Sequence, residues 1–337
     1  MQSLRSELEI KSKWNDFPLD PLVSICCITF NHVDFIEDAL KGFLNQNTTF
    51  PFEIIIHDDA SNDGTSEIVK SYLAAYPTII RLVLQTENQY SLGRKITASL
   101  LPLCRGKYIA LCEGDDYWID NDKLTKQIDT FRRDEEVSIV FHKALELNHY
   151  RKEISPICDH FDSDRFISSS LAFLKRGSFM PTASLVFKNT EIYPLIEILN
   201  HSPVADFFIQ TFFSLNGKVV YLNFSGSIYR TNINGSWSSL QKDQSKKIKT
   251  SYDMFRAVDY AYGVLKSKNR SWYLGFPLSF YLISYSWRQP TKIKKIKAFF
   301  REFSRIRYFS RSLLVIFMAF CILEYLYKYR KRNHLVV

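Results

Sequence analysis

Residues 22–30 of this chain read LVSICCITF, an apolar and β-branched run that predicts a short buried strand. Apolar residues at helical spacing follow it, from Ile36 to Leu44. The alternation then repeats, with strands predicted at 53–57, 79–84, 107–112 and 137–141 and helices at about 68–73, 94–104 and 122–131. Strands that alternate with helices over about 140 residues predict a doubly wound, mostly parallel α/β sheet with flanking helices.

The pattern after residue 150 is looser. A polar loop is predicted at 151–167, a helix at 168–176, a strand at 183–187, helices near 190–200 and 205–216, and two short strands, KVVYL (218–222) and GSIYR (226–230). Long helical patterns run from about residue 241 to the end.

Charge divides the 337 residues into two parts. Residues 1–240 hold 23 Lys/Arg and 30 Asp/Glu, whereas residues 241–337 hold 21 Lys/Arg and 5 Asp/Glu. We therefore predict an ordinary acidic domain at 1–240 and a basic helical region at 241–337 that suits a polyanion. A hydrophobic content of 46% excludes a disordered or collagenous chain. The six cysteines show no zinc-site spacing.

Two acidic clusters follow directly after predicted strands. They are HDDASNDGT at 57–65 and CEGDDYW at 112–118. Ligands of doubly wound sheets bind at the carboxyl ends of the strands, so both clusters should lie at one edge of the sheet. Three carboxylates on one short turn repel each other, and Mg²⁺ or Mn²⁺ carrying a diphosphate is their natural partner. Alternatively, each cluster is a solvated turn held by Asp and Asn side chains.

The three blocks LVSICCITFNHVDFIEDALKGFLNQ, FEIIIHDDASNDGT and GKYIALCEGDDYW, in this order, resemble family 2 of the inverting glycosyltransferases, which have the GT-A fold. The resemblance covers roughly residues 20–238. Within the family, the chain resembles the bacterial surface-polysaccharide type. It implies transfer of a sugar from a nucleotide-sugar donor, most simply UDP-linked, to a hydroxyl of a glycan or lipid-linked acceptor.

The resemblance also implies roles for single residues. Thr29 would face the nucleotide base, Asp59 would bind it, and Asp58 would support the turn. Glu113-Gly114-Asp115 takes the place of the family's DxD motif, with Asp115 on a Mn²⁺ or Mg²⁺ ion and Glu113 on the ribose or a metal-bound water. Asp116 would contact the ion directly or support its ligands. The first acidic residue is here Glu rather than Asp. Arg94 or Lys95 is the donor-side basic residue that the family often has, and a surface cation is the alternative.

The segment SPVADFFIQTFFSLNGKVVYL (202–222) resembles the acceptor side of the family. There Asp206 occupies the place of the general base, and helix capping is its alternative role. Thr182 is the candidate acceptor contact. SIYRTNINGSW resembles the segment that closes over the diphosphate, with Arg230 and Trp237 as donor contacts, although Asn232 stands where relatives often have His.

The basic end of the chain interleaves cations with apolar residues. KIKKIKAFFREFSRIRYFSR at 292–311 has the composition of an interfacial helix, and eleven uncharged apolar residues follow at 313–323. Residues 313–327 would lie in a membrane interface, span the membrane, or be buried against protein. Because the first residues carry no apolar segment typical of a secretory signal, we expect a cytoplasmic protein that is peripheral on the inner face of the cell membrane and binds no nucleic acid.

Two other functions fit parts of the sequence. A sugar nucleotidyltransferase would have a sheet of related type, but it should carry a Gly-rich basic loop after the first strand, where this chain has ITFNHVDF. A catalytically degenerate scaffold at the membrane is the alternative without chemistry, and the intact Asp59, Asp115 and Asp206 argue against it.

Overall fold

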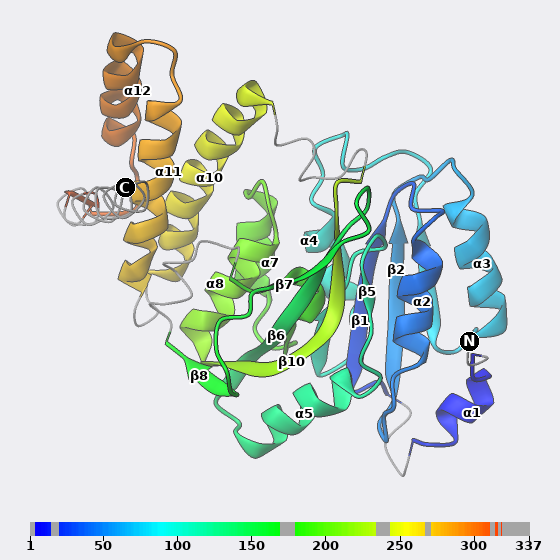
Figure 1. Cartoon of the computed structure of the whole chain (residues 1–337). Helices are drawn as coiled ribbons and strands as arrows, with labels where there is room; N and C mark the ends of the chain where they lie inside the picture. The colour runs from blue at the N-terminus through cyan, green and yellow to red at the C-terminus, as the bar shows by residue number, and fades with distance from the viewer. Residues whose placement is uncertain are drawn as a thin grey trace, which may run out of the picture.

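A twisted sheet with helices on both faces forms the body of the molecule (Figure 1). The computed structural model describes residues 4–14, 20–168, 179–233, 243–266 and 271–310, together with 314, 315 and 318. The strands are β1 (Val23–Thr29), β2 (Phe52–Asp58), β3 (Ile80–Leu84), β4 (Tyr108–Leu111), β5 (Tyr117–Trp118), β6 (Val137–Asn148), β7 (Ile154–Ile157), β8 (Arg165–Ile167), β9 (Val186–Lys188) and β10 (Lys218–Thr231). The helices are α1 (Glu7–Lys11), α2 (Ile36–Leu44), α3 (Thr65–Ala75), α4 (Ile96–Leu100), α5 (Lys123–Arg133), α7 (Tyr193–Asn200), α8 (Asp206–Asn216), α10 (Gln244–Leu265), α11 (Gly275–Trp287) and α12 (Lys292–Ser304), with 3₁₀ turns η1 (Leu101–Leu103), η2 (Thr182–Ser184) and η3 (Ser271–Leu274).

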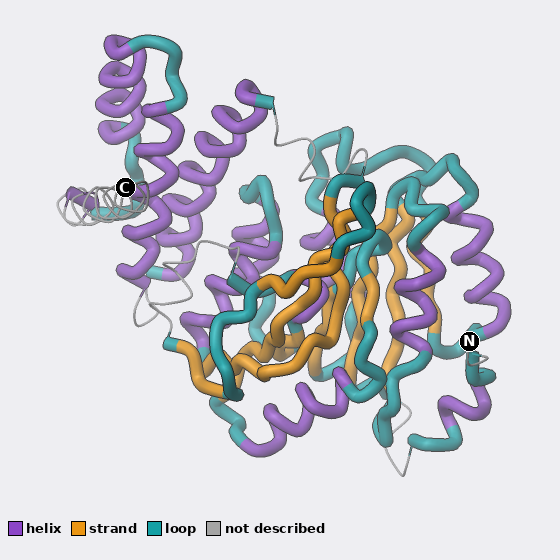
Figure 2. Tube along the Cα trace, in the orientation of Figure 1, coloured by secondary structure: helices purple, strands orange, loops and turns teal. Residues whose placement is uncertain are grey.

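The strand order is β3-β2-β1-β4-β9-β6-β10-β5, with β7 paired to β6 and β8 paired to β10. Strands β3, β2, β1 and β4 run parallel, as do β6 and β10, whereas β9 is antiparallel to both β4 and β6. The expected mostly parallel sheet is therefore confirmed. Strand β9 lies between β4 and β6 and is antiparallel to both, so it separates the parallel strands β3, β2, β1 and β4 from the parallel pair β6 and β10. β5, β7 and β8 are also antiparallel to their partners. Figure 2 shows the strands of the sheet in orange.

The two faces of the sheet bury different side chains because successive residues of a strand point to opposite faces. In β1, Ile25 and Cys27 belong to a core that includes α2, α3 and α5. Cys26, which lies between them, belongs to a second core that includes residues of α7, α8, α10 and α11. A strand that is buried on both sides reads as a continuous apolar run, which is why LVSICCITF shows no alternation.

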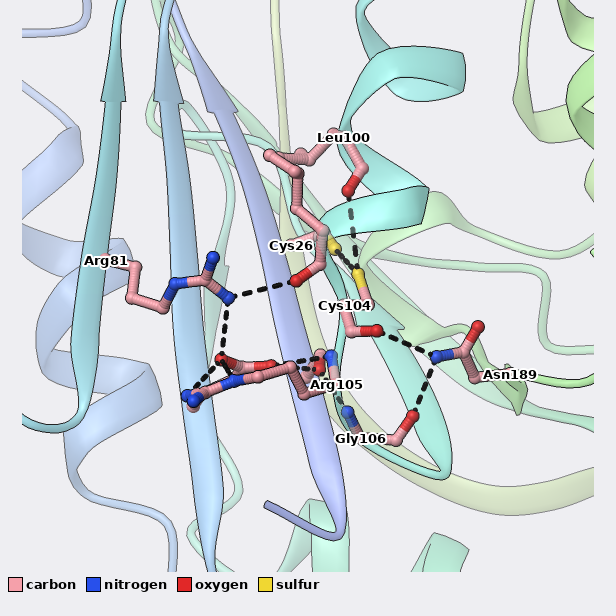
Figure 3. A network of polar contacts seen from close by, with 10 residues as sticks. Cys26, Arg81, Leu100, Cys104, Arg105, Gly106 and Asn189 are labelled. Atoms are coloured by element: carbon pink, nitrogen blue, oxygen red, sulfur yellow. Dashed lines mark hydrogen bonds and ion pairs between the residues drawn. The ribbon is translucent and has the colours of Figure 1, made fainter. Parts of the chain in front are cut away.

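A buried carboxylate ties strands β1 and β2 to the turn before β4 (Figure 3). The Glu53 carboxylate accepts hydrogen bonds from the Ser24 hydroxyl at 2.7 Å and from the Arg105 guanidinium at 2.8 Å. It also accepts from Arg81 at 3.1 Å. Just after β9, the side-chain amide of Asn189 donates to the carbonyls that flank Arg105 in the same turn, at 3.1 and 2.9 Å. This network fixes the start of β4, and so the place where the acidic turn after β4 emerges.

The structure corrects two strand predictions. KVVYL and GSIYR are one strand, β10, because register shifts after Leu222 and Ser225 let the polar residues between them stay in the pairing with β6. The predicted loop 151–167 contains β7 and β8, which pair at the border of the sheet and are largely exposed, so their sequences show no apolar alternation.

Smaller differences concern where single helices and strands begin. Asp122 precedes α5, but its side chain does not cap the helix and instead accepts from the Asn47 amide at 3.2 Å. The predicted strand 183–187 begins as η2 and becomes β9 only at Val186. The helix predicted at 168–176 lies almost wholly outside the described residues.

Helices α10, α11 and α12 form the basic carboxyl-terminal part, as the helical patterns predicted. α10 packs against α7, and side chains of α10 and α11 such as Phe255 and Leu278 share a core with α8 and the sheet. The division at residue 240 stays a prediction. Among the described residues, no helix has the length and apolar character needed to cross a membrane. Most of the apolar segment 313–327 lies outside those residues.

Lys123, at the start of α5, is a fully buried cation. Its Nζ donates to Gln127 Oε1 at 2.8 Å and lies 4.0 Å from the centroid of the Trp118 ring. Burial lowers the pKa of Lys123 to about 7. Between that pH and the ordinary lysine pKa of about 10.4, the unfolded chain binds a proton that the folded protein does not. The folded state is therefore penalised most below pH 7, and its stability rises as the pH increases above 7.

Lys123→Met is expected to stabilise the protein at pH 6.5 by on the order of 2 kcal/mol and to help much less at pH 9.5, because only the lysine side chain carries a desolvation cost that falls with pH. Urea unfolding of both proteins at the two pH values measures this. Lys126→Met, at an exposed position of the same helix, is the control. Equal pH dependence of Lys123→Met and wild type would exclude Lys123 as the titrating group.

Candidate active site

The two acidic clusters lie side by side at the carboxyl ends of β1, β2 and β4. The amide of Asp59 donates to the Thr29 carbonyl at 3.0 Å, and the amide of Gly114 donates to the Ile28 carbonyl at 2.9 Å. The expectation that both clusters share one edge is therefore confirmed. The turn after β4 passes so close to β1 that a Cβ on Gly114 would lie 2.6 Å from Thr29 Oγ1. Only glycine fits there.

Thr29 is fully buried beneath this turn, and its Oγ1 lies 3.2 Å from His32 Nδ1. His32 in turn places Nε2 4.0 Å from Asp115 Oδ2. Burial lowers the pKa of His32, while the Asp115 carboxylate acts in the opposite direction. Sequence reasoning did not select His32, although its place just past the end of the first strand was a usable signal.

Glu113, Asp115 and Asp116 bring carboxylate oxygens within 4.8 Å of one another. Asp116 is buried, and burial together with Asp115 and Glu113 raises its pKa well above the usual range. One Asp116 oxygen accepts from the Arg230 amide at 2.9 Å, whereas Oδ2 has no partner among the described residues. A buried, unpaired carboxylate oxygen beside two further carboxylates fits a hard divalent cation.

The Glu113 side chain is exposed at the wall of a cavity. Desolvation by the protein atoms around it, followed by the carboxylates of Asp115 and Asp206, raises the pKa of Glu113 to about 8. The two neighbouring carboxylates add to the effect of desolvation, because each disfavours a further negative charge on Glu113.

Arg230 of β10 clamps the acidic turn from outside. Its Nη1 donates to the Asp115 carbonyl at 2.8 Å, and its guanidinium pairs with Asp38 of α2. The guanidinium carbon also lies 5.0 Å from the Phe35 ring and 4.3 Å from the Tyr117 ring. The Arg230 side chain is buried, and its contacts are with the acidic turn, Asp38 and the two rings. It therefore lies against the turn and does not line the cavity.

Asp58 and Asp59 are also buried and engaged. Asp58 accepts from the Ser61 amide at 3.0 Å and from the Ser66 hydroxyl. Asp59 accepts the amides of Gln89 at 2.7 Å and Tyr90 at 3.0 Å. Asp59 thus organises the loop after β3, and this loop supplies Tyr90, Arg94 and Lys95 to the cavity wall.

A cavity of about 660 Å³ lies beside the acidic turn. It collects predicted residues from distant parts of the sequence, namely Arg94, Lys95, Glu113, Thr182 and Asp206. Burial lowers the pKa of Lys95. Sequence reasoning missed Glu146 and Tyr229, which also line the cavity from β6 and β10. The distant pairing of these two strands had no signal in the sequence.

Asp206 is the first residue of α8 and follows the N-cap Ala205, so it is not the capping residue. Its Oδ1 accepts from the Phe207 amide at 2.7 Å, and burial raises its pKa. The side chain is half-buried at the wall that it shares with Thr182 and Glu113. Asp206 is therefore part of the cavity wall. Trp237 lies outside the described residues.

Comparison with known proteins agrees with this arrangement. Residues 24–186 match Glycosyl transferase family 2. An uncharacterized protein of Mycobacterium tuberculosis is 35% identical over 228 residues, which cover 66% of this chain and 63% of the relative. The chain thus spans less than two thirds of the length of this relative.

Two solved structures show the same fold. S. aureus TarS in complex with UDP-GlcNAc superposes with a TM-score of 0.60 at 14% identity, covering 85% of this chain and 81% of that one. The mannosyltransferase PcManGT from Pyrobaculum calidifontis, in complex with GDP-Man and Mn²⁺, gives a TM-score of 0.52 at 16% identity and covers 93% and 86%. The GT-A fold expected from the sequence is therefore confirmed.

Proposed function

We propose that this protein is a metal-dependent inverting glycosyltransferase, which moves a sugar from a nucleotide-sugar, most simply UDP-linked, to a hydroxyl of a glycan or lipid-linked acceptor. The observation that carries the proposal is the meeting of the acidic turn after β4 with Asp206 at one cavity. The match of residues 24–186 to Glycosyl transferase family 2 and the nucleotide-sugars in the two solved structures support it.

Asp115 and Asp116 would hold a Mn²⁺ or Mg²⁺ ion, with Glu113 on the ribose or on a water of that ion. Such an ion neutralises the charge of the departing nucleoside diphosphate. Contacts within the protein fix the positions of these carboxylates without a bound donor. Arg230 holds the Asp115 carbonyl and the Asp116 carboxylate in position, and the raised pKa of Asp116 reports a site that gains from a bound cation.

Asp206 would act as the general base. The acceptor oxygen attacks the anomeric carbon and forms the new glycosidic bond, the bond from that carbon to the diphosphate breaks, and Asp206 takes the acceptor proton. Attack from the face opposite the leaving group inverts the anomeric configuration. The raised pKa of Asp206 suits a base that must hold a proton briefly.

The remaining residues would bind the two substrates. On the donor side, Thr29, Asp58 and Asp59 shape the base pocket through the backbone that they fix, Arg94 or Lys95 faces the diphosphate, and Trp237 with Arg230 belongs to the closing segment. Thr182 contacts the acceptor. The acceptor would be part of a surface polysaccharide, and the protein would work on the cytoplasmic side, peripheral to the cell membrane.

A screen of nucleotide-sugars tests the proposal. With Mn²⁺ present, the true donor should raise the melting temperature, since a ligand at about 100 times its Kd adds about 2.7 kcal/mol of stability. EDTA should abolish the shift. With an α-linked donor, NMR of the product should show a β-linkage. Retention of configuration would exclude the inverting mechanism, and the absence of any shift across UDP-, GDP- and other nucleotide-sugars would exclude donor binding.

A further inference from the structure

The outer face of α12 carries an apolar stripe that no described residue covers. Ile293, Ile296 and Phe300 are 66%, 59% and 64% exposed. Positions i, i+3 and i+7 lie on one side of a helix, so these three side chains form a single surface. On the opposite side, Ala298 and Glu302 are buried where α12 packs against α11. Figure 1 shows α10, α11 and α12 in this order away from the sheet, so α12 is the outermost of the three helices.

Contacts at the carboxyl end of α12 and in the segment after it fix the rotation of the helix, so the stripe does not turn inward. Arg301 donates to the Tyr285 hydroxyl of α11 at 2.9 Å. After the helix, the buried Asp259 of α10 accepts the amides of Arg307, Tyr308 and Phe309 at 3.0 to 3.2 Å. These polar contacts hold the helix and the segment after it against α10 and α11.

Cations border the stripe, and α12 itself, which is described throughout, carries no exposed acid. Lys292, Lys294, Lys297 and Arg301 are exposed, whereas the one acidic residue of α12, Glu302, is buried. Trp287 at the end of α11 is 67% exposed just before the helix begins. Exposed apolar residues on a cationic helix, with a neighbouring tryptophan, are the features of a helix that lies in a membrane interface.

We propose that the α12 stripe is a membrane-docking surface, on which Ile293, Ile296 and Phe300 enter the interface of an anionic bilayer while the bordering cations contact its headgroups. A second copy of this chain is a poor occupant, because an isologous contact would bring the same four cations together from both partners. The inference rests on the proposed function in one respect, since docking would serve a transferase whose acceptor is held by lipid.

Flotation of the full-length protein with vesicles tests the surface without any enzymatic readout. Wild type should float with mixed phosphatidylglycerol–phosphatidylcholine vesicles and less with phosphatidylcholine alone. The triple variant Ile293→Ser/Ile296→Ser/Phe300→Ser should lose on the order of tenfold or more in partitioning, at low and high salt alike. Lys292→Gln/Lys294→Gln/Lys297→Gln should lose about fivefold per lysine at low salt and little at high salt.

A matched triple variant is the control. Leu8→Ser/Ile154→Ser/Phe166→Ser removes side chains of similar size and exposure from α1, β7 and β8, and it should float like wild type. Three results would overturn the inference: wild type that stays at the bottom of the gradient, a stripe variant that floats as wild type does, or a wild-type dimer that the stripe variant turns into a monomer. The last result would assign the stripe to a second copy.

Hydrolysis of nucleotide-sugar in solution separates this inference from the proposed function. The stripe variant should hydrolyse donor at the wild-type rate, since α12 contributes no residue to the cavity. If no variant and no wild type hydrolyses donor while wild type still floats, the proposed function fails and the docking surface stands. If donor is hydrolysed but wild type does not float, the docking surface fails alone.

Discussion

Asp115→Ala is expected to abolish sugar transfer and metal-dependent nucleotide binding while leaving the protein folded. The Asp115 side chain is half-buried on the acidic turn. Arg230 binds the backbone carbonyl of Asp115, which an alanine at this position still has. The substitution therefore removes a metal ligand without removing the clamp. Calorimetric titration of UDP with and without Mn²⁺ measures the effect directly, and circular dichroism checks the fold.

Two further variants sharpen this test. Glu113→Asp should keep appreciable activity, because it restores the residue type of the family motif at the same charge. Asp129→Ala removes a carboxylate that pairs with Arg132 on the surface of α5 and should change nothing at the site. Unchanged Mn²⁺-dependent nucleotide affinity in Asp115→Ala would falsify the assignment of Asp115 to the metal.

Asp206→Asn is expected to lower turnover by about 10²- to 10⁴-fold, the usual contribution of a positioned base, with donor affinity nearly intact. Asparagine is isosteric, and its Oδ1 still accepts the Phe207 amide that the aspartate oxygen accepts now. The start of α8 should therefore keep its geometry while the cavity loses its base. Steady-state kinetics with the true acceptor give turnover, and nucleotide titration gives donor affinity.

The matched control is Asp129→Asn, the same chemical change at the surface of α5, and it should leave turnover unchanged. If Asp206→Asn transfers sugar within a few-fold of the wild-type rate, another carboxylate takes the proton. Glu146 is then the next candidate, because it lines the same cavity and is held by Thr231 at 2.6 Å.

The first half of the sheet could be predicted because its strands are buried on both faces. Short apolar, β-branched runs such as 22–30 and 107–112 predict buried strands, and β1 and β4 follow them within a residue or two. Strand ends in a parallel sheet meet at one edge, so the approach of the Asp58-Asp59 and Glu113–Asp116 clusters followed from their order along the chain. The second half has exposed strands and bulges, and there the same reasoning predicts two short strands where the structure has the single strand β10.

The sequence by itself determined the parallel sheet, the family resemblance of its first part and the carboxylates that any metal would need, because local apolar patterns and motif order carry that information. Only the tertiary structure decided what the polar groups contact. Asp59 is bonded to the loop after β3, Arg230 is enclosed by Asp38 and two rings, and Glu146 reaches the cavity from a strand paired across the chain. Likewise, which side of α12 stays exposed depends on its packing against α11. Hydrogen bonds and packing between segments far apart in sequence leave no periodic pattern in either segment, so only the tertiary structure shows these contacts.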